Sequence, residues 1–203
     1  MQSVHWDSKN IFPSKIICIG RNYVGHIKEL ANEVPDEPVI FIKPNSALST
    51  EIQAGENGSI HYEGEICFIL QSGEMRGVGF GLDLTKRHVQ DKLKAKSLPW
   101  ERAKAFDGAA VFSDFVSFHG DLNQLRLELF INDQLVQDGG CELMLFKPEQ
   151  LLNEVKSFLS LEDGDVIMSG TPQGAGPFFA GDRFVGRIFA QDKLLIEAAW
   201  LAT

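Results

Sequence analysis

The amino-acid sequence predicts a β-rich α+β fold, organised as a single domain over residues 1–203. Seven short runs are apolar or alternate between apolar and polar residues, a pattern typical of strands, whereas only three stretches have helical signals. Of the 203 residues, 44% are hydrophobic and 15 are phenylalanine, so the chain can bury a sizeable core. The predicted strands span residues 16–19, 39–42, 60–70, 125–131, 165–168, 183–189 and 194–200.

Two pairs of predicted strands are joined by tight turns. Residues 125–131 alternate, reach Asn132 and Asp133, and are followed by a second apolar stretch, which predicts a β-hairpin. Residues 191–193 predict a second hairpin turn near the C-terminus.

Three helices are predicted. The first covers residues 24–31 and is stopped by Pro35, and the second covers residues 87–96 with Thr85 as its N-cap. The third opens at Pro148, and its apolar residues recur at helical spacing, so one face of this helix is expected to face the core.

The chain is acidic, with 28 Asp and Glu against 19 Lys and Arg and a net charge of −9. An acidic excess without a basic stripe argues against nucleic-acid and membrane-surface partners, because phosphate contacts need clustered Lys and Arg. The three cysteines, Cys18, Cys67 and Cys141, are widely spaced, which fits a reducing compartment and neither a disulfide framework nor a zinc site. No signal peptide is visible, and no apolar run approaches the ~20 residues of a membrane span. We therefore predict a cytoplasmic protein.

Two glutamates stand out in the strand over residues 60–70. Glu63 and Glu65 are two residues apart, so on a strand they project to the same face. Two like charges side by side repel each other unless a cation lies between them, and a hard divalent cation such as Mg²⁺ meets that need. The alternative is an exposed strand end whose glutamates face water.

Asp83 is a candidate third carboxylate. It ends a glycine-dotted run, residues 77–85, just before the second predicted helix. Glycines in a strand often mark the close approach of a ligand or of another backbone. Asp83 is equally explained as a turn or capping residue.

His26 and Glu29 form a candidate general base. Their i, i+3 spacing places them on one face of the first helix, where a carboxylate orients an imidazole. The alternative is a solvated helix face. Residues 20–38 are polar and bounded by proline, which suits a lid.

Two further features have both a chemical and a structural interpretation. Lys104 lies between alanines and close to aromatic residues, so it is either an electrophilic partner for an enolate or a surface lysine. The Gly- and Pro-rich loop over residues 169–177 either presents backbone N–H groups and the Thr171 hydroxyl to an anion or is a structural turn.

Taken together, these segments resemble the fumarylacetoacetate hydrolase family over residues 16–189. Six blocks occur in the order of the family, which is more specific than any one of them. The blocks are residues 17–23 (ICIGRNY) followed by His26 and Glu29, residues 41–44 (FIKP), residues 63–65 (EGE), residues 81–87 (GLDLTKR) with Gln90, residues 99–107 (PWERAKAFD), and residues 164–172 (GDVIMSGTP) with Gly174 and Gly176.

The resemblance implies a mixed β-sheet roll or sandwich with a few short helices, assembled as a homodimer. It implies Mg²⁺ or Mn²⁺ held by Glu63, Glu65 and Asp83. Because the chain begins almost directly at the catalytic domain, it is similar to the small members of the family that act on acylpyruvates or oxaloacetate. Two departures are Gly64, where members often have Val, and His88, where they often have Asp.

The resemblance also implies an activity. We expect a metal-dependent hydrolase that cleaves a carbon–carbon bond in a small acylpyruvate-type 2-oxo acid through a metal-bound enolate. His26 and Glu29 would activate water, and Lys104 would stabilise the enolate. The alternatives are oxaloacetate decarboxylase or tautomerase, 2-oxo-acid hydratase or isomerase, and a catalytically silent metal-stabilised dimer that binds 2-oxo acids. The expected substrate contacts are Arg21, Lys43, Gln90 and Thr171.

Overall fold

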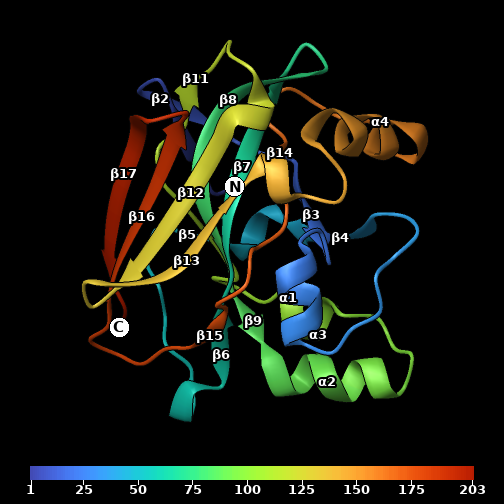
Figure 1. Ribbon diagram of the computed structural model, residues 1–203, viewed down its shortest axis with the longest axis vertical. Coiled ribbons are helices and arrows are strands. Elements are labelled where there is room, and N and C mark those ends of the chain that lie inside the picture. The colour runs from blue at the N-terminus through green and yellow to red at the C-terminus, as the bar shows by residue number, and fades with distance from the viewer.

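A computed structural model describes all 203 residues and confirms the β-rich α+β class. A large mixed sheet carries a smaller antiparallel sheet on one face, and four short helices lie around them (Figure 1). The helices are α1 (Val24–Glu29), α2 (Arg87–Ala95), α3 (Glu101–Lys104) and α4 (Pro148–Phe158).

The large sheet has eight strands and combines parallel and antiparallel pairs. Strands β3 and β14 pair in parallel, as do β10 and β5, and the other pairs are antiparallel. In spatial order the sheet contains β4 (Val39–Pro44), β3 (Lys15–Gly20), β14 (Val166–Met168), β7 (Gly64–Gln71), β8 (Glu74–Asp83), β10 (Ala110–Phe112) and β5 (Leu48–Ser49), and β11 (Val116–Ser117) also pairs with β8.

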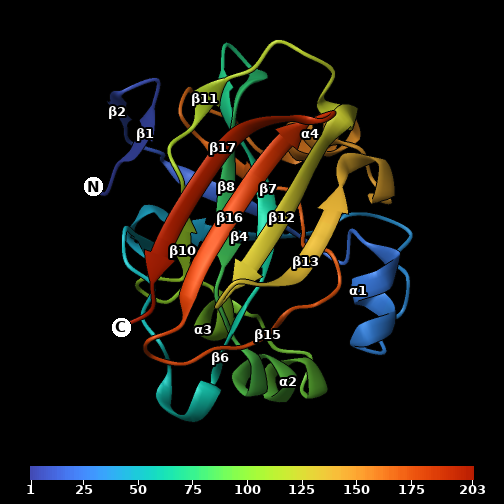
Figure 2. The same cartoon turned by 60° about the vertical axis from the view of Figure 1, so that its left-hand side comes forward.

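The four-stranded sheet lies across β7 and β8, as the rotated view shows (Figure 2). Its strands are β13 (Gln134–Gly140), β12 (Leu125–Ile131), β16 (Arg183–Ala190) and β17 (Lys193–Leu201). The main core fills the space between the two sheets and includes Phe80, Leu129 and Ile188, all without exposed surface. The sheets approach closely at Gly186, where a Cβ atom would lie 2.4 Å from the Phe80 ring.

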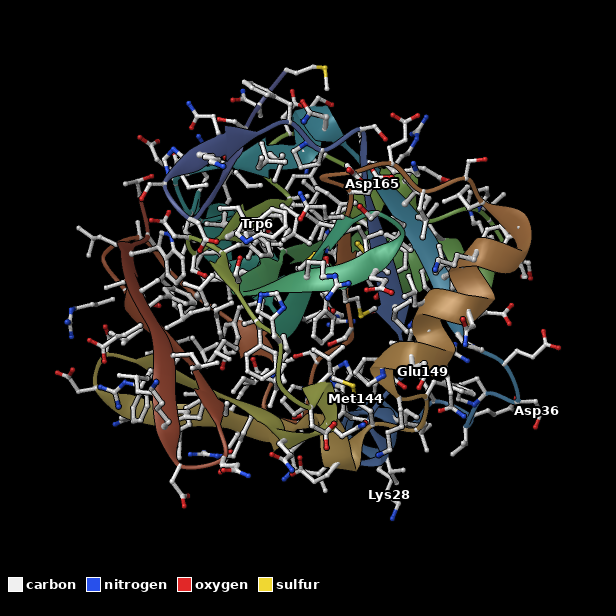
Figure 3. The ribbon with its side chains drawn as sticks, turned by 90° about the horizontal axis from the view of Figure 1, so that it is seen from above. Trp6, Lys28, Asp36, Met144, Glu149 and Asp165 are labelled. Carbon is white, nitrogen blue, oxygen red and sulfur yellow. The ribbon has the colours of Figure 1, made fainter.

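Smaller strands complete the fold. The N-terminal hairpin is β1 (Val4–Trp6) and β2 (Lys9–Ile11), and the third sheet contains β15 (Gly176–Pro177), β6 (Ile60–Tyr62) and β9 (Thr85–Lys86). Helices α2 and α3 lie beside β9, at the end of the molecule opposite α4 (Figure 1). Seen end-on, Lys28 and Asp36 project outward at the rim (Figure 3). None of the helices is long and apolar enough to cross a membrane.

Both predicted hairpin turns are present. Asn132 and Asp133 have φ values of 50° and 64°, the left-handed backbone of a two-residue turn that matches the twist of the flanking strands. Residues 191–192 join β16 to β17 in a second two-residue turn, in which Gln191 has a φ of 53°. The third predicted helix is α4, and its Leu151 and Val155 are buried, as its apolar spacing predicts.

Four local predictions need correction. The run over residues 60–70 breaks at Glu63, which separates β6 from β7. Thr85 does not cap α2, because it belongs to β9 and its hydroxyl bonds to the carbonyl oxygen of Asp83. The first helix ends at Glu29 instead of residue 31, since Ala31 takes a left-handed φ of 49°. Helix α3 was not predicted, because four residues are too few to show a helical period.

Candidate active site

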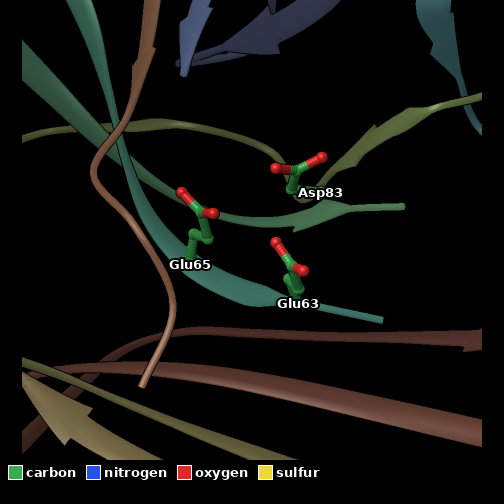
Figure 4. A group of neighbouring side chains, drawn as sticks. All are labelled: Glu63, Glu65 and Asp83. Carbon is green, nitrogen blue, oxygen red and sulfur yellow. The ribbon is translucent and has the colours of Figure 1, made fainter. Parts of the chain in front are cut away.

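Three buried carboxylates meet where β7 begins and β8 ends (Figure 4). Glu63 lies just before β7, Glu65 lies on it, and Asp83 is the last residue of β8. The antiparallel register pairs Glu65 with Gly81, and the Asp83 N–H donates to the Glu63 carbonyl at 2.9 Å, which brings the third acid beside the first two. One oxygen from each carboxylate lies within 4.8 Å of the others.

Lysine and arginine side chains surround these acids. The Lys104 ammonium donates to Glu63 Oε2 at 2.8 Å, to Asp83 Oδ2 at 2.7 Å and to the Thr85 hydroxyl at 2.6 Å. Lys43 lies 2.8 Å from Asp83 Oδ1. The position of Lys104 among the carboxylates explains why it is buried, and it excludes the interpretation as a surface lysine.

The carboxylates experience different electrostatic environments. Burial opposes ionisation of Glu63, but the charges of Lys104 and Arg87 outweigh burial and hold its pKa below the ordinary value. Burial and then the negative charge of Asp83 raise the pKa of Glu65 well above the ordinary value. Burial disfavours the charged form of Lys104, yet Asp83 and Glu63 outweigh it and raise the pKa of that ammonium.

The donor set fits a hard divalent cation. Three carboxylates supply oxygen ligands, which Mg²⁺ and Mn²⁺ prefer. Glu65 is the acid that most lacks partners, since it forms no ion pair and accepts only the Gly170 N–H, at 2.7 Å, whereas Asp83 is paired with Lys43 and Lys104. A cation between them would balance charges that the protein leaves close together.

The predicted His–Glu pair is formed. His26 Nδ1 lies 3.0 Å from Glu29 Oε2 on α1. His26 is buried and lines the same pocket as Glu63, whereas Glu29 borders a separate surface hollow. The Gly174 N–H donates to both Glu29 oxygens, at 3.1 and 3.3 Å, so the 169–177 loop holds the carboxylate that orients the imidazole.

The predicted substrate contacts divide into two groups. Arg21, Gln90 and Thr171 line the pocket, although the Thr171 hydroxyl already donates to the Gly64 carbonyl at 2.9 Å. Lys43 does not line it. Its side chain is fully buried, pairs with Asp83 and donates to the Lys104 carbonyl, so in this structure Lys43 contacts Asp83 instead of the pocket.

The two departures from the family pattern have different surroundings. Gly64 is crowded, since a Cβ atom there would lie 3.0 Å from Gln137 Oε1 and 3.1 Å from Phe80. Gln137 accepts the Gly64 N–H and donates to Thr171, so it occupies the volume that a larger residue would need. His88 is exposed on α2 and does not line the pocket.

Sequence reasoning missed several pocket residues, among them Arg87, Lys94 and Trp100. Arg87 donates to Glu63 and, at 2.8 Å, to Gln90, and Lys94 and Trp100 lie nearby in the pocket lining. Arg87 and Trp100 lie within blocks that support the resemblance, and Lys94 lies between two of those blocks. The signal that could have found Lys94 is its spacing from Arg87 and Gln90, which places it on the same face of α2.

Comparisons with known proteins identify the family of the chain. Residues 15–197 match the family model described as Fumarylacetoacetate (FAA) hydrolase C-terminal. Oxaloacetate tautomerase YcgM of Escherichia coli (strain K12) is 40% identical, with 83% of this chain and 85% of that protein covered. A crystal structure of a fumarylacetoacetate isomerase/hydrolase-type protein from Oleispira antarctica is 35% identical with a TM-score of 0.95, and each chain is covered completely.

A third comparison concerns a metal. Fumarylpyruvate hydrolase from Pseudomonas aeruginosa, solved in complex with Mn²⁺ and pyruvate, is 26% identical with a TM-score of 0.87, covering 99% of this chain and 94% of that one. The fold, the clustered carboxylates and the match over residues 15–197 lead to one conclusion. The chain belongs to the fumarylacetoacetate hydrolase family.

Proposed function

We propose that this protein is an oxaloacetate tautomerase, which interconverts the keto and enol forms of a small 2-oxo acid. The observation that carries the proposal is a base and a cation in one pocket: His26, oriented by Glu29, and the Lys104 ammonium. Tautomerisation needs a base at C3 and positive charge near the oxygen on C2. The similarity to the Escherichia coli tautomerase supports the same reaction.

His26, Glu29 and Lys104 have separate roles in the proposed reaction. His26 removes a proton from C3, and Glu29 holds the imidazole in place. Lys104 supplies positive charge close to the oxyanion that develops at C2, and transfer of the proton held by His26 to that oxygen completes the enol. A Mg²⁺ or Mn²⁺ ion held by Glu63, Glu65 and Asp83 would supply a Lewis acid for the 2-oxo carboxylate end of the substrate.

Acylpyruvate hydrolysis is the second candidate, and the His26–Glu29 pair favours it. A carboxylate-oriented imidazole is suited to activate water for attack on a distal carbonyl, the first step of carbon–carbon cleavage. The fold is shared with fumarylpyruvate hydrolase. Both reactions pass through an enolate, so the same Lys104 serves either.

One set of assays separates these activities. Metal-loaded protein is mixed with enol oxaloacetate, followed by ultraviolet absorbance, and separately with acetylpyruvate, followed by pyruvate release. Chelator-sensitive ketonisation without pyruvate release supports the tautomerase, and chelator-sensitive pyruvate release from acetylpyruvate supports the hydrolase. Loss of neither substrate rejects both activities and leaves a binding protein.

His26→Gln tests the base. We expect the tautomerisation rate to fall by about 10²- to 10⁴-fold, the usual contribution of general base catalysis. His5→Gln is the matched control, because His5 is exposed and pairs only with exposed Asp114. A His26→Gln protein with unchanged rate would remove His26 from the mechanism.

A further inference from the structure

Two cations line the active-site pocket without an acidic partner. Arg21, at the end of β3, and Lys94, on α2, both border the pocket that contains Glu63 and Glu65. Neither forms an ion pair with any carboxylate of the chain. Arg87 differs from them, since its guanidinium is committed to Glu63 and Gln90.

The two unpaired cations add positive charge to the same pocket. Burial lowers the pKa of Lys94, and the charges of Arg21 and Arg87 lower it further. The Arg21 Nε atom is buried and has no hydrogen-bond partner. Lys94 lies 5.3 Å from the centre of the Trp100 ring, which holds the ammonium on the pocket side. A buried donor and two neighbouring cations create a local need for an anion.

The backbone holds Arg21 in an unfavourable conformation. Its φ of 56° lies in the left-handed region, which costs a non-glycine residue roughly 1–2 kcal/mol. The next residue, Asn22, fixes this geometry, because it donates to the Ser169 carbonyl at 2.8 Å and accepts the Phe146 N–H at 2.8 Å. Strain that the surroundings enforce is typical of functional positions.

We infer that Arg21 and Lys94 form a subsite for the distal carboxylate of a dicarboxylic 2-oxo acid. This inference rests on the proposed function and adds the two residues that recognise the distal carboxylate of the substrate. The 2-oxo carboxylate end of the substrate lies toward Glu63, Glu65 and Asp83, and the far carboxylate pairs with the Arg21 guanidinium and the Lys94 ammonium. A substrate with an uncharged far end leaves both cations unpaired, so the pocket selects against it.

Oxaloacetate and its 4-ethyl ester test this subsite. They share the 2-oxo acid end and the carbon that loses a proton, but only oxaloacetate has a distal charge. We expect the wild-type protein to prefer oxaloacetate in kcat/KM by at least about 100-fold, and Lys94→Met and Arg21→Asn each to reduce that preference by at least about 10-fold. Asparagine is chosen because it tolerates the left-handed backbone of Arg21.

The expected change is confined to one substrate. Each variant raises KM for oxaloacetate and leaves the ester unchanged, whereas a structural defect lowers activity on both. Lys92→Met is the matched control, because Lys92 is exposed on the same helix and does not line the pocket. An unchanged preference in both Lys94→Met and Arg21→Asn, or an equal loss on both substrates, overturns the subsite.

Binding measurements separate this inference from the proposed function. Isothermal titration of the metal-loaded protein with the same two compounds reports affinity separately from the rate of tautomerisation. If oxaloacetate is not tautomerised but binds more tightly than the ester, and Lys94→Met removes that difference, the proposed activity fails and the subsite stands. Equal affinities for the two compounds in the wild-type protein reject the subsite whatever the activity.

Discussion

Glu65 has the fewest partners of the three clustered acids. It accepts one backbone N–H, from Gly170, and it faces Asp83 and Glu63 from within the protein interior. Lys104 and Arg87 neutralise Glu63, and Lys43 and Lys104 neutralise Asp83. Glu65 is therefore the residue whose negative charge depends most on a bound cation.

Replacing Glu65 by Gln tests the metal site. The change keeps the size of the side chain and removes its charge, so we expect affinity for Mg²⁺ and Mn²⁺ to fall by at least about 100-fold, measured by isothermal titration. The metal-free protein should be as stable as the wild type or more stable, since burial and Asp83 already raise the pKa of Glu65. Glu128→Gln, which removes a carboxylate from the β12 ion pairs, is the control. Undiminished metal binding by Glu65→Gln would refute the ligand assignment.

The 169–177 loop connects two elements of the site. It follows β14, provides the Gly170 N–H to Glu65, and provides the Gly174 N–H to Glu29 on α1. One short segment therefore contacts both Glu65, one of the three clustered carboxylates, and the His26–Glu29 pair. In this structure His26 and Glu29 are paired, and Glu29 on α1 contacts the loop. That residues 20–38 act as a lid stays a prediction.

Gly174→Ala tests the loop. Gly174 has a φ of 99°, and a Cβ atom there would lie 2.0 Å from the Val136 carbonyl oxygen, so the loop must shift and its N–H must move away from Glu29. We expect a loss of stability of about 2–3 kcal/mol in urea unfolding and a roughly 10- to 100-fold lower rate of the proposed tautomerisation.

Gly181→Ala is the control for this change. Gly181 has a φ of 93° and no atom within 4 Å of the added Cβ, so it isolates the backbone strain, about 1 kcal/mol, and should keep full activity. If Gly174→Ala keeps full activity, as Gly181→Ala is expected to do, the contact between the loop and Glu29 does not contribute to the reaction.

Across the whole molecule, charge is distributed unevenly. The chain has a net charge of −9, yet Arg21, Arg87 and Lys94 line the pocket. Local positive potential on an acidic protein attracts anionic substrates to one place. The homodimer and the cytoplasmic location stay predictions, and sedimentation of the purified protein checks the former.

Asp165 joins distant parts of the chain. Its buried carboxylate accepts the Ser14 hydroxyl at 2.7 Å, the Lys15 ammonium at 2.5 Å and the Glu162 N–H at 2.9 Å. These contacts tie the start of β3 to the turn before β14, two strands that pair in parallel. The sequence placed Asp165 in one of the blocks shared with the family, but it indicated no structural role for this residue.

Asp165→Asn should weaken the fold in a pH-dependent way. Burial opposes ionisation, but the hydrogen bonds from Lys15, Glu162 and Ser14 outweigh it and lower the pKa of Asp165 below 3.8. The wild-type carboxylate therefore stabilises the fold above pH ~4, and this contribution is lost as the pH falls through the lowered pKa.

At pH 7 we expect the variant to lose about 2–3 kcal/mol in urea unfolding, and the difference from wild type should shrink toward pH 3. Asp133→Asn, which breaks an exposed pair with Arg183, should cost less than about 1 kcal/mol. Unfolding curves that stay equally separated at every pH would contradict the assignment.

The sequence by itself determined the strand-rich class, the hairpin turns at residues 132–133 and 191–193, and the core face of α4, because these depend on local periodicity. It also determined the candidate acids, because they stand in blocks that follow the order of the family. Only the tertiary structure decided that Lys104 lies among the acids, that Lys43 supports Asp83 from outside the pocket, and that Lys94 joins Arg21 at the pocket wall. These residues are 21 to 73 positions apart in the sequence. They come together through the pairing of β7 with β8 and the placement of α2 and α3 beside β9, which no short sequence window contains.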